Sequence, residues 1–320
     1  MPVITTSSYQ APLLFQNGHI QTIYARIFRQ VPKIKYIRER ISTPDQDFID
    51  LDWSKTDSKK LAVLCYGLES DSQANYVKGM VKALNHKKWD CVVFNFRGCS
   101  GEPNYQMRSY HSGVTEDLEY IIQYILKNYQ YQKISLVGFS LGGNLILKYL
   151  GEKGMSLPSF IKTAVTISTP CDLQSSAIRL AQKENQIYMK RFLKKLYKKI
   201  YIKEKERNLV FPRPFSTIKN FKDFDDFYTA PIHGFKDAMD YWAKCSSRFF
   251  IPSIAIPTLL INAQNDPFLG PESFPSEITQ DHDCFFLETP QSGGHMGFVT
   301  FGQNEYWHET RTLSFISEHT

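Results

Sequence analysis

The sequence predicts an α/β fold with a mostly parallel, doubly wound sheet flanked by helices. Strand-like and helix-like segments alternate along most of the 320 residues, and that order places parallel strands in one sheet with helices on both faces. A second observation is the apolar character of the central strands, which is typical of strands buried on both sides. The predicted strands cover 34–41, 47–53, 61–67, 91–96, 134–139, 163–168, 257–263 and 283–289.

The predicted helices lie between many of these strands. The segment 114–129 is the clearest, because its apolar residues recur at the spacing of one helix face. Thr115 stands at its start, followed by two acidic residues that suit the first turn of a helix. The remaining predicted helices cover 75–86, 141–150, 235–245 and 304–320.

The connection between the sixth and seventh predicted strands is far longer than a crossover needs. We expect a helical lid inserted after strand 6, at residues 171–232, with residues 1–170 and 233–320 forming the core. Its apolar residues at helical spacing are Phe192, Leu193, Leu196, Tyr197, Ile200 and Tyr201, and Lys194, Lys195, Lys198 and Lys199 fall on the opposite arc. The expected arrangement is a helix packed on the protein with a solvated lysine face. The alternative is a lid that covers an acyl pocket and leans on anionic lipid.

Positive charge is concentrated in this segment. Lys190–Arg207 contains nine Lys or Arg and two Glu, a net charge of +7, whereas the whole chain carries +6. The rest of the chain is therefore close to neutral, which argues against a nucleic-acid surface spread over the fold. The charge pattern favours a function confined to this segment, such as peripheral contact with an anionic membrane. No secretory signal or membrane-spanning stretch is visible, so we expect a cytoplasmic protein.

The six cysteines are scattered without a C-x-x-C pair. Cys65, Cys91 and Cys284 fall in or beside apolar, strand-like runs. We interpret them as small core residues in a reducing compartment rather than as zinc ligands or disulfides. No motif in the chain implies a metal or a cofactor.

The most informative stretch is ISLVGFSLGGNLILKYLGE at 134–152. A strand runs directly into Gly138-Phe139-Ser140-Leu141-Gly142, and a helical pattern follows at once. This is the G-x-S-x-G pattern of a nucleophile elbow, a tight turn that lifts a serine hydroxyl out of the chain. Side chains two residues before and after the serine would clash, which explains the two glycines. The sequence therefore predicts Ser140 as a nucleophile; the alternative is an ordinary turn that happens to use glycines.

A serine nucleophile needs a histidine base. Because the chain order in such hydrolases is serine, acid, histidine, the base should lie downstream. We expect His295, which sits in a glycine-containing turn directly after a strand. His282 precedes the last strand, at its wrong end, and His308 and His319 belong to the last helical pattern, where we expect them to be solvated.

The acid that orients the histidine should also follow a strand. Asp266 lies a few residues past a buried strand and before a proline that favours an open turn, with Asn265 as a polar neighbour. The alternative is Asp172, which follows the preceding strand and could equally cap a turn or a helix. We favour Asp266.

An oxyanion hole needs two N–H donors. One is the backbone amide of Leu141, directly after the serine. The other should come from the loop after the third predicted strand, where Gly67 lets the backbone turn and Leu68 offers its amide. Both donors are backbone amides, which almost any residue could supply, so the residue types do little to test this prediction.

Several motifs resemble the YheT-like group of the α/β-hydrolase superfamily. They are NGHIQTIYARIFR (17–29), YGLESDS (66–72), NFRGCSGEPN (95–104), SYHSGVTEDL (109–118), GFSLGGNLILKYLGE (138–152), NDPF (265–268) and GGHMGF (293–298). The resemblance implies an α/β-hydrolase fold and carries over Ser140, Asp266 and His295 as the triad. This chain has Tyr66 where the group commonly has histidine, which puts the arrangement of the oxyanion loop in question.

The loop RGCSGEPNYQMRSYHSG follows the fourth predicted strand and should lie at the edge of the site. Arg97 or His111 could contact the substrate there, or could tie the loop down by hydrogen bonds. We favour the structural role.

The predicted function is hydrolysis of carboxylic esters through an acyl-enzyme, as in an esterase or lipase. The resemblance implies short-chain or medium-chain acyl esters, lipid esters included, as small-molecule substrates. Two alternatives stay open. An acyltransferase would use the same triad with an alcohol as acceptor, and a non-catalytic member would keep the fold only for binding.

Overall fold

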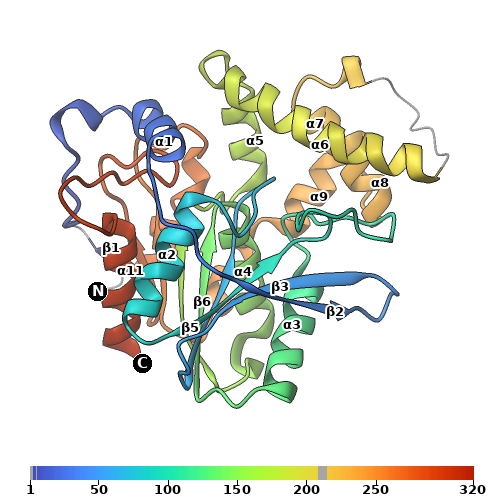
Figure 1. The fold of residues 1–320 in the computed structure, drawn as a ribbon. Coiled ribbons are helices and arrows are strands. Elements are labelled where there is room, and N and C mark those ends of the chain that lie inside the picture. The colour runs from blue at the N-terminus through green and yellow to red at the C-terminus, as the bar shows by residue number, and fades with distance from the viewer. Residues whose placement is uncertain (1–2, 5, 208–214) are drawn as a thin grey trace.

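The computed structural model describes residues 3–4, 6–207 and 215–320 (Figure 1). Within these residues nine strands form one sheet, in the order β1-β9-β8-β7-β6-β4-β5-β3-β2. β3 runs antiparallel to both β2 and β5, and all other neighbours are parallel. The strands are β1 (Val3–Ile4), β2 (Ile37–Ser42), β3 (Phe48–Ser54), β4 (Lys60–Cys65), β5 (Asp90–Asn95), β6 (Lys133–Phe139), β7 (Ile161–Ile167), β8 (Thr258–Ile261) and β9 (Phe285–Glu288). The predicted fold class is confirmed.

All eight predicted strands are present, and one strand was missed. β1 holds only two residues and pairs with the edge of β9, where Ile4 lies opposite Glu288. So short a segment carries no periodicity, and its extended conformation depends on a neighbour that is distant in the sequence.

The longer helices cover both faces of the sheet (Figure 1). α2 packs with α11 on one face, and α3 packs with α4 on the other. The helices are α1 (Gly18–Ile27), α2 (Asn75–His86), α3 (Thr115–Asn128), α4 (Leu141–Lys153), α5 (Leu173–Ala181), α6 (Gln186–Arg207), α7 (Phe221–Phe224), α8 (Ala230–His233), α9 (Ala238–Cys245), α10 (Ser276–Gln280) and α11 (Trp307–His319). The helix predicted from residue 235 begins at Ala238, because the side chain of Asp237 caps its first turn.

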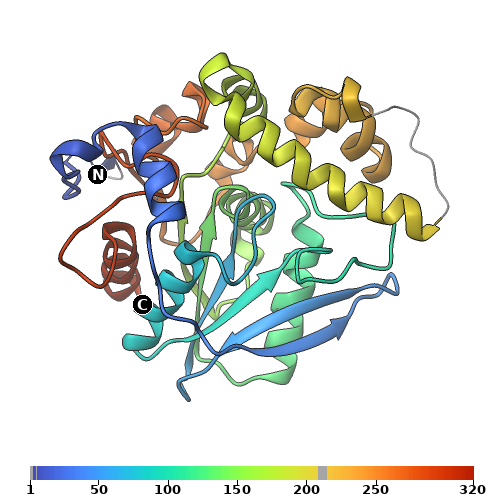
Figure 2. The same cartoon turned by 45° about the horizontal axis from the view of Figure 1, so that its top comes forward.

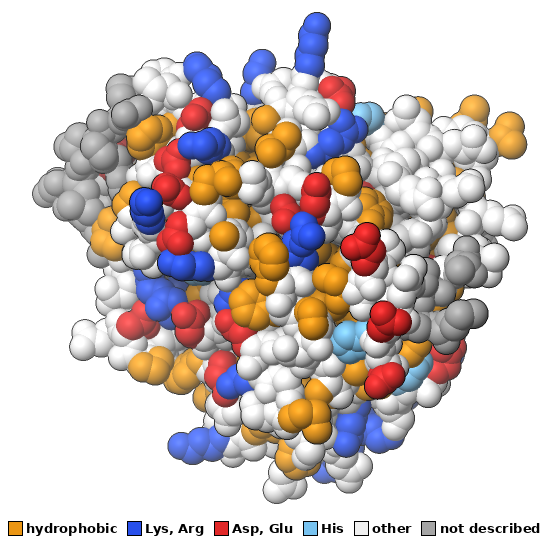
Figure 3. Space-filling view, turned by 180° about the vertical axis from the view of Figure 1, so that it is seen from behind, with side chains coloured by type: hydrophobic (Ala, Val, Ile, Leu, Met, Phe, Trp, Pro, Cys, Tyr) orange, Lys and Arg blue, Asp and Glu red, His pale blue; other side chains and the backbone are white. Residues whose placement is uncertain are grey.

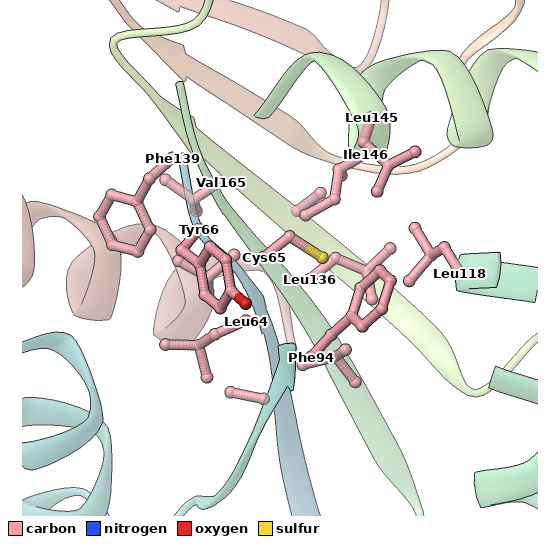
Figure 4. Packing of buried hydrophobic residues seen from close by; sticks show 14 of the residues in the cluster. Leu64, Cys65, Tyr66, Phe94, Leu118, Leu136, Phe139, Leu145, Ile146 and Val165 are labelled. Atoms are coloured by element: carbon pink, nitrogen blue, oxygen red, sulfur yellow. The ribbon is translucent and has the colours of Figure 1, made fainter. Parts of the chain in front are cut away.

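The core lies between the central strands and these helices (Figure 4). Leu64, Phe94 and Leu136 come from three neighbouring strands, and they pack with Leu118 of α3 and Ile146 of α4. All of them are fully buried. Burying each such side chain contributes about 1.5–3 kcal/mol. The rigid sheet that results fixes the positions of the loops at its carboxyl edge.

All six cysteines are free thiols within the described residues. Cys65 and Cys91 are fully buried in β4 and β5, as predicted. Cys284 is only partly buried, because it lies just before β9 rather than inside it.

Helices α5 to α9 lie between β7 and β8 in the sequence. They cross the molecule at the carboxyl ends of the parallel strands, with the long α6 in front (Figures 1 and 2). Phe192 and Phe221 are in ring contact across α6 and α7, so this insertion has an apolar interior of its own. On the face seen from behind Figure 1, acidic, basic and apolar side chains intermingle without a large basic patch (Figure 3).

Candidate active site

Ser140 occupies a sharp turn between β6 and α4. Its backbone has φ 50° and ψ −120°, a conformation that residues other than glycine adopt only at a cost of about 1–3 kcal/mol. A Cβ on Gly142 would lie 2.3 Å from the carbonyl oxygen of Cys65, and one on Gly138 would lie 2.6 Å from the Cα of Gly143. The start of α4 therefore packs so closely on the strand ends that both positions require glycine.

Three side chains from distant parts of the chain meet at this turn. His295 Nε2 lies 3.0 Å from Ser140 Oγ, and His295 Nδ1 lies 2.9 Å from Asp266 Oδ2. An ionised carboxylate can only accept a hydrogen bond, so Nδ1 carries the proton and Nε2 accepts from the serine hydroxyl. The ring of Phe268 stacks on the imidazole with centroids 4.1 Å apart. The order of these contacts is the one that proton transfer from a serine requires.

The histidine loop is held by three consecutive backbone amides. Gly294 N–H donates to Asn265 Oδ1 at 2.9 Å, and His295 N–H donates to Thr22 Oγ1 at 2.8 Å. Met296 N–H donates to Ser168 Oγ at 2.9 Å. The three acceptors come from three separate segments, so the imidazole is positioned from several sides. Asn265 was expected nearby, whereas the roles of Thr22 and Ser168 were not predicted.

The two predicted oxyanion donors border the same space. Gly67 lies so close to Ser140 that a Cβ on it would be 3.1 Å from the serine Cβ, which brings Leu68 beside the hydroxyl. Leu141 opens α4, where backbone amides have no partner inside the helix. Over the residues that the structure describes, no hydrogen-bond acceptor contacts either amide. Both amides are thus available, and their role remains a prediction.

A cavity of about 420 Å³ opens above Ser140 and His295. Helices α5 to α7 of the insertion cover the cavity, and much of the cavity lining is apolar. Apolar lining residues include Leu173, Leu180, Phe192, Leu196, Phe221 and Phe268. Several lysines of α6 line it as well. A cavity of this size and character suits a small molecule with an apolar part.

Comparison with known proteins identifies the family. A sequence profile of the alpha/beta hydrolase fold matches residues 63–301. The chain is 33% identical to YheT of Escherichia coli (strain K12), over 95% of this chain and 91% of that protein. This protein is a YheT-like α/β-hydrolase. The resemblance inferred from the sequence motifs is confirmed.

This α/β-hydrolase is also similar to other known proteins. It is 28% identical to the monoacylglycerol lipase of Saccharomyces cerevisiae (strain ATCC 204508 / S288c), over 95% of this chain and 79% of that protein. Among solved structures, the Pyrococcus furiosus esterase Pf2001 superimposes with a TM-score of 0.61 at 17% identity, covering 92% of this chain and 96% of that one. The structural likeness shows the shared fold.

Asp172, the alternative acid, is not part of the hydrogen-bonded series from Ser140 through His295 to Asp266. Asp172 caps α5 by accepting from Ser175 N–H, and it pairs with Arg248 at 3.2 Å. This is the capping role that was weighed for it. Asp266, in contrast, accepts from the amide of Phe268 at 2.9 Å, which fixes the carboxylate beside His295.

The prediction that His308 is solvated was wrong. His308 is 0% exposed, and neither ring nitrogen has a hydrogen-bond partner among the described residues. Burial lowers the pKa of His308, and the charge of Arg29 lowers it further. The periodicity of the last helix did not reveal this, because the residue faces the core between α11 and the sheet, where its ring packs against Phe139 and Phe298. His282 contacts the backbone carbonyl of Ile251 at 3.1 Å and accepts from the amide of Phe285, at the start of β9, at 3.0 Å.

Arg97 ties down the loop after β5. Its guanidinium binds both oxygens of Asp117 at 2.8 Å, and it also contacts Asp45 at 2.8 Å and Asp47 at 3.0 Å. His111 is buried against the ring of His233, with centroids 4.5 Å apart. Both residues border the cavity, and their contacts favour the structural role.

Tyr66 points into the core rather than toward the serine (Figure 4). Its hydroxyl accepts from the amide of Phe96 at 3.0 Å and contacts Asn95 Oδ1 at 3.3 Å. The residue therefore joins the chain just after β4 to the end of β5, while the neighbouring Gly67 packs closely on Ser140.

The expected lysine arc of α6 is only partly solvated, which corrects the sequence interpretation. Lys194, Lys195 and Lys198 are exposed, whereas Lys199 is partly buried. The ammonium groups of Lys195 and Lys199 both contact Glu69, beneath the helix. Lys203 is buried and donates to the backbone carbonyl of Gln106 at 3.0 Å. The helical periodicity predicted that these lysines face the solvent, because a sequence pattern does not show that polar groups such as Glu69 lie below the helix.

Proposed function

We propose that this protein is a serine hydrolase that cleaves carboxylic esters through an acyl-enzyme. The observation that carries the proposal is the line from Ser140 Oγ through His295 to Asp266, with contacts of 3.0 Å and 2.9 Å, at the floor of a largely apolar cavity. The relatives named an esterase and a monoacylglycerol lipase support the same class of reaction.

In the proposed mechanism, Ser140 attacks the ester carbonyl while His295 Nε2 takes its proton. Asp266 keeps the imidazole in the required tautomer and stabilises its charged form. The amides of Leu68 and Leu141 hold the negative charge that develops on the carbonyl oxygen. His295 then protonates the leaving alcohol, and water repeats the two steps to release the acid.

We propose short-chain or medium-chain acyl esters, including lipid esters, as the substrates. The apolar side chains that the insertion places above Ser140 would surround an acyl chain, and burying each CH₂ group there contributes about 0.8 kcal/mol. A series of aryl esters of increasing acyl length measures this directly. Adding an alcohol to the same assay distinguishes hydrolysis from acyl transfer, because a transferase would form the new ester in preference to the acid.

The decisive test replaces Ser140 by alanine. We expect kcat to fall by about 10³-fold or more and labelling by a fluorophosphonate probe to disappear, while the thermal unfolding temperature stays near that of the wild type. Ser314→Ala is the matched control, because Ser314 lies exposed on α11. Near-normal turnover by Ser140→Ala would rule out the proposed nucleophile, and wild-type protein that resists the probe would favour the non-catalytic alternative.

We also propose that residues 171–232 act as a lid and that the surface beside it contacts anionic lipid. Lys190, Lys194 and Lys198 form an exposed stripe along α6. Before α1, Leu13 and Leu14 are 88% and 81% exposed. Exposed apolar side chains and an exposed basic stripe are both features that suit the interface of a bilayer. Among the described residues, no helix has the length and apolar content needed to cross a membrane.

Vesicle sedimentation tests this contact. Binding to phosphatidylcholine vesicles should increase when phosphatidylglycerol is included and decrease with added salt, because the attraction is partly electrostatic. Leu13→Ser with Leu14→Ser should weaken it further. Binding that ignored lipid charge, salt and both leucines would refute a membrane contact at this surface.

A further inference from the structure

Glu69 stands directly after the proposed oxyanion donor Leu68 and has a constrained backbone. Its φ is 53°, a left-handed value that costs a residue with a side chain about 1–2 kcal/mol. It is also 7% exposed, although it carries a carboxylate. A buried charge in such a conformation persists only where the surroundings hold it firmly.

One support for Glu69 comes from the loop after β5. The amide of Glu69 donates to the hydroxyl of Tyr110 at 2.9 Å, and that hydroxyl donates to Glu69 Oε1 at 2.7 Å. The ring of Tyr110 stacks on Phe96, with centroids 4.9 Å apart. Tyr110 therefore fixes both the backbone and the carboxylate of Glu69 from the side of the core.

The second support comes from α6. Lys195 Nζ donates to the backbone carbonyl of Glu69 at 2.6 Å, and Lys199 Nζ lies 2.8 Å from Glu69 Oε1. The two lysines are one helical turn apart, so they point the same way. Lys199 also contacts Cys99 Sγ at 2.7 Å. Burial alone would lower the pKa of Lys199, but the neighbouring Cys99 and Glu69 raise it overall, so the ammonium stays charged.

We propose that Lys195 and Lys199 are positioning residues that act through Glu69 to set the oxyanion hole. When α6 lies over the cavity, its two ammonium groups hold Glu69, and Glu69 fixes the adjacent peptide so that the Leu68 amide faces Ser140. Gly67 is already in close contact with the serine, so a small rotation of this loop changes the direction of that amide. The seating of the insertion and the completion of the catalytic site are therefore coupled. The inference rests on the proposed function, because it assumes that Leu68 stabilises an oxyanion.

The first experiment measures kcat and KM for a soluble aryl ester with the whole chain. Lys199→Met should lower kcat by roughly tenfold to a hundredfold and leave KM close to the wild-type value, whereas Lys199→Arg should restore most of the rate. The matched control is Lys127→Met, which removes an exposed helical lysine on α3. A change confined to KM would make Lys199 a substrate contact and overturn the positioning role.

A double-mutant cycle with Glu69→Gln tests whether Lys199 acts through Glu69. Once the Glu69 charge is gone, Lys199→Met should have little further effect on kcat, because both changes break the same contact. Effects that multiply independently would show that Lys199 does not act through Glu69. Thermal unfolding of each variant, followed in parallel, identifies any that has simply lost its fold.

Hydrogen exchange provides a measurement independent of turnover. In Lys199→Met, amides in residues 66–72 should exchange faster than in the wild type, and those of the central strands should not change. Unchanged protection of this loop would refute the coupling even if the enzyme is an esterase. Conversely, if Ser140→Ala retained activity, the proposed function would fail while the exchange result still reported the contact between α6 and the loop.

Discussion

Replacing Gly142 by alanine should disable the elbow without unfolding the protein. The added Cβ would lie 2.3 Å from the carbonyl oxygen of Cys65 and 2.6 Å from that of Tyr66, so the start of α4 must shift by roughly 1 Å to restore ordinary contact distances. Overpacking of this kind costs about 1–3 kcal/mol. A shift of about 1 Å in catalytic groups lowers a rate about 100-fold. We therefore expect kcat/KM to fall by roughly two orders of magnitude while unfolding remains cooperative.

The assay pairs hydrolysis of a soluble aryl ester with thermal unfolding. Gly302→Ala is the control, because Gly302 has φ 75° and nothing within 4 Å of an added Cβ, so alanine there adds backbone strain without a clash. It should lower stability and leave the rate unchanged. The steric explanation of the elbow would be wrong if Gly142→Ala hydrolysed the ester at nearly the wild-type rate, or if both variants lost activity in proportion to their stability.

Two further predictions concern buried charges. Burial raises the pKa of Asp225 from 3.8 to about 7, so the native state retains a proton that the unfolded chain releases, and stability should fall as the pH rises between these values. Asp225→Asn should therefore unfold at higher urea than the wild type at about pH 8 but not at about pH 4; parallel urea midpoints would contradict this. Arg97→Met should lower the unfolding free energy by about 3–5 kcal/mol, because Asp45, Asp47 and Asp117 lose their shared cation. An unfolding temperature equal to that of the wild type would show that this cluster does not stabilise the fold.

The local features of the site could be predicted because they are steric or follow the order of the chain. Gly138 and Gly142 flank Ser140 since no Cβ fits there, and that restriction acts within a few residues. Asp266 and His295 each follow a strand of a parallel sheet, and the carboxyl ends of such strands share one edge. The alternation of strands and helices fixed the fold class for the same reason, since each element has its own periodicity.

Long-range contacts decided what the sequence patterns could not. His295 depends on a hydroxyl from Thr22, and nothing in the local pattern of α1 indicates that its polar face packs on a loop near the other end of the chain. The periodicity of α6 divides apolar from basic residues, but only the position of Glu69 beneath the helix determines that the ammonium groups of Lys195 and Lys199 contact it. His308 is buried because α11 packs its polar residue against the core. Sequence alone therefore determined the helices and strands and the order of the reactive groups along the chain. Only the tertiary structure decided which groups each side chain contacts, because burial and pairing depend on neighbours that are distant in the sequence.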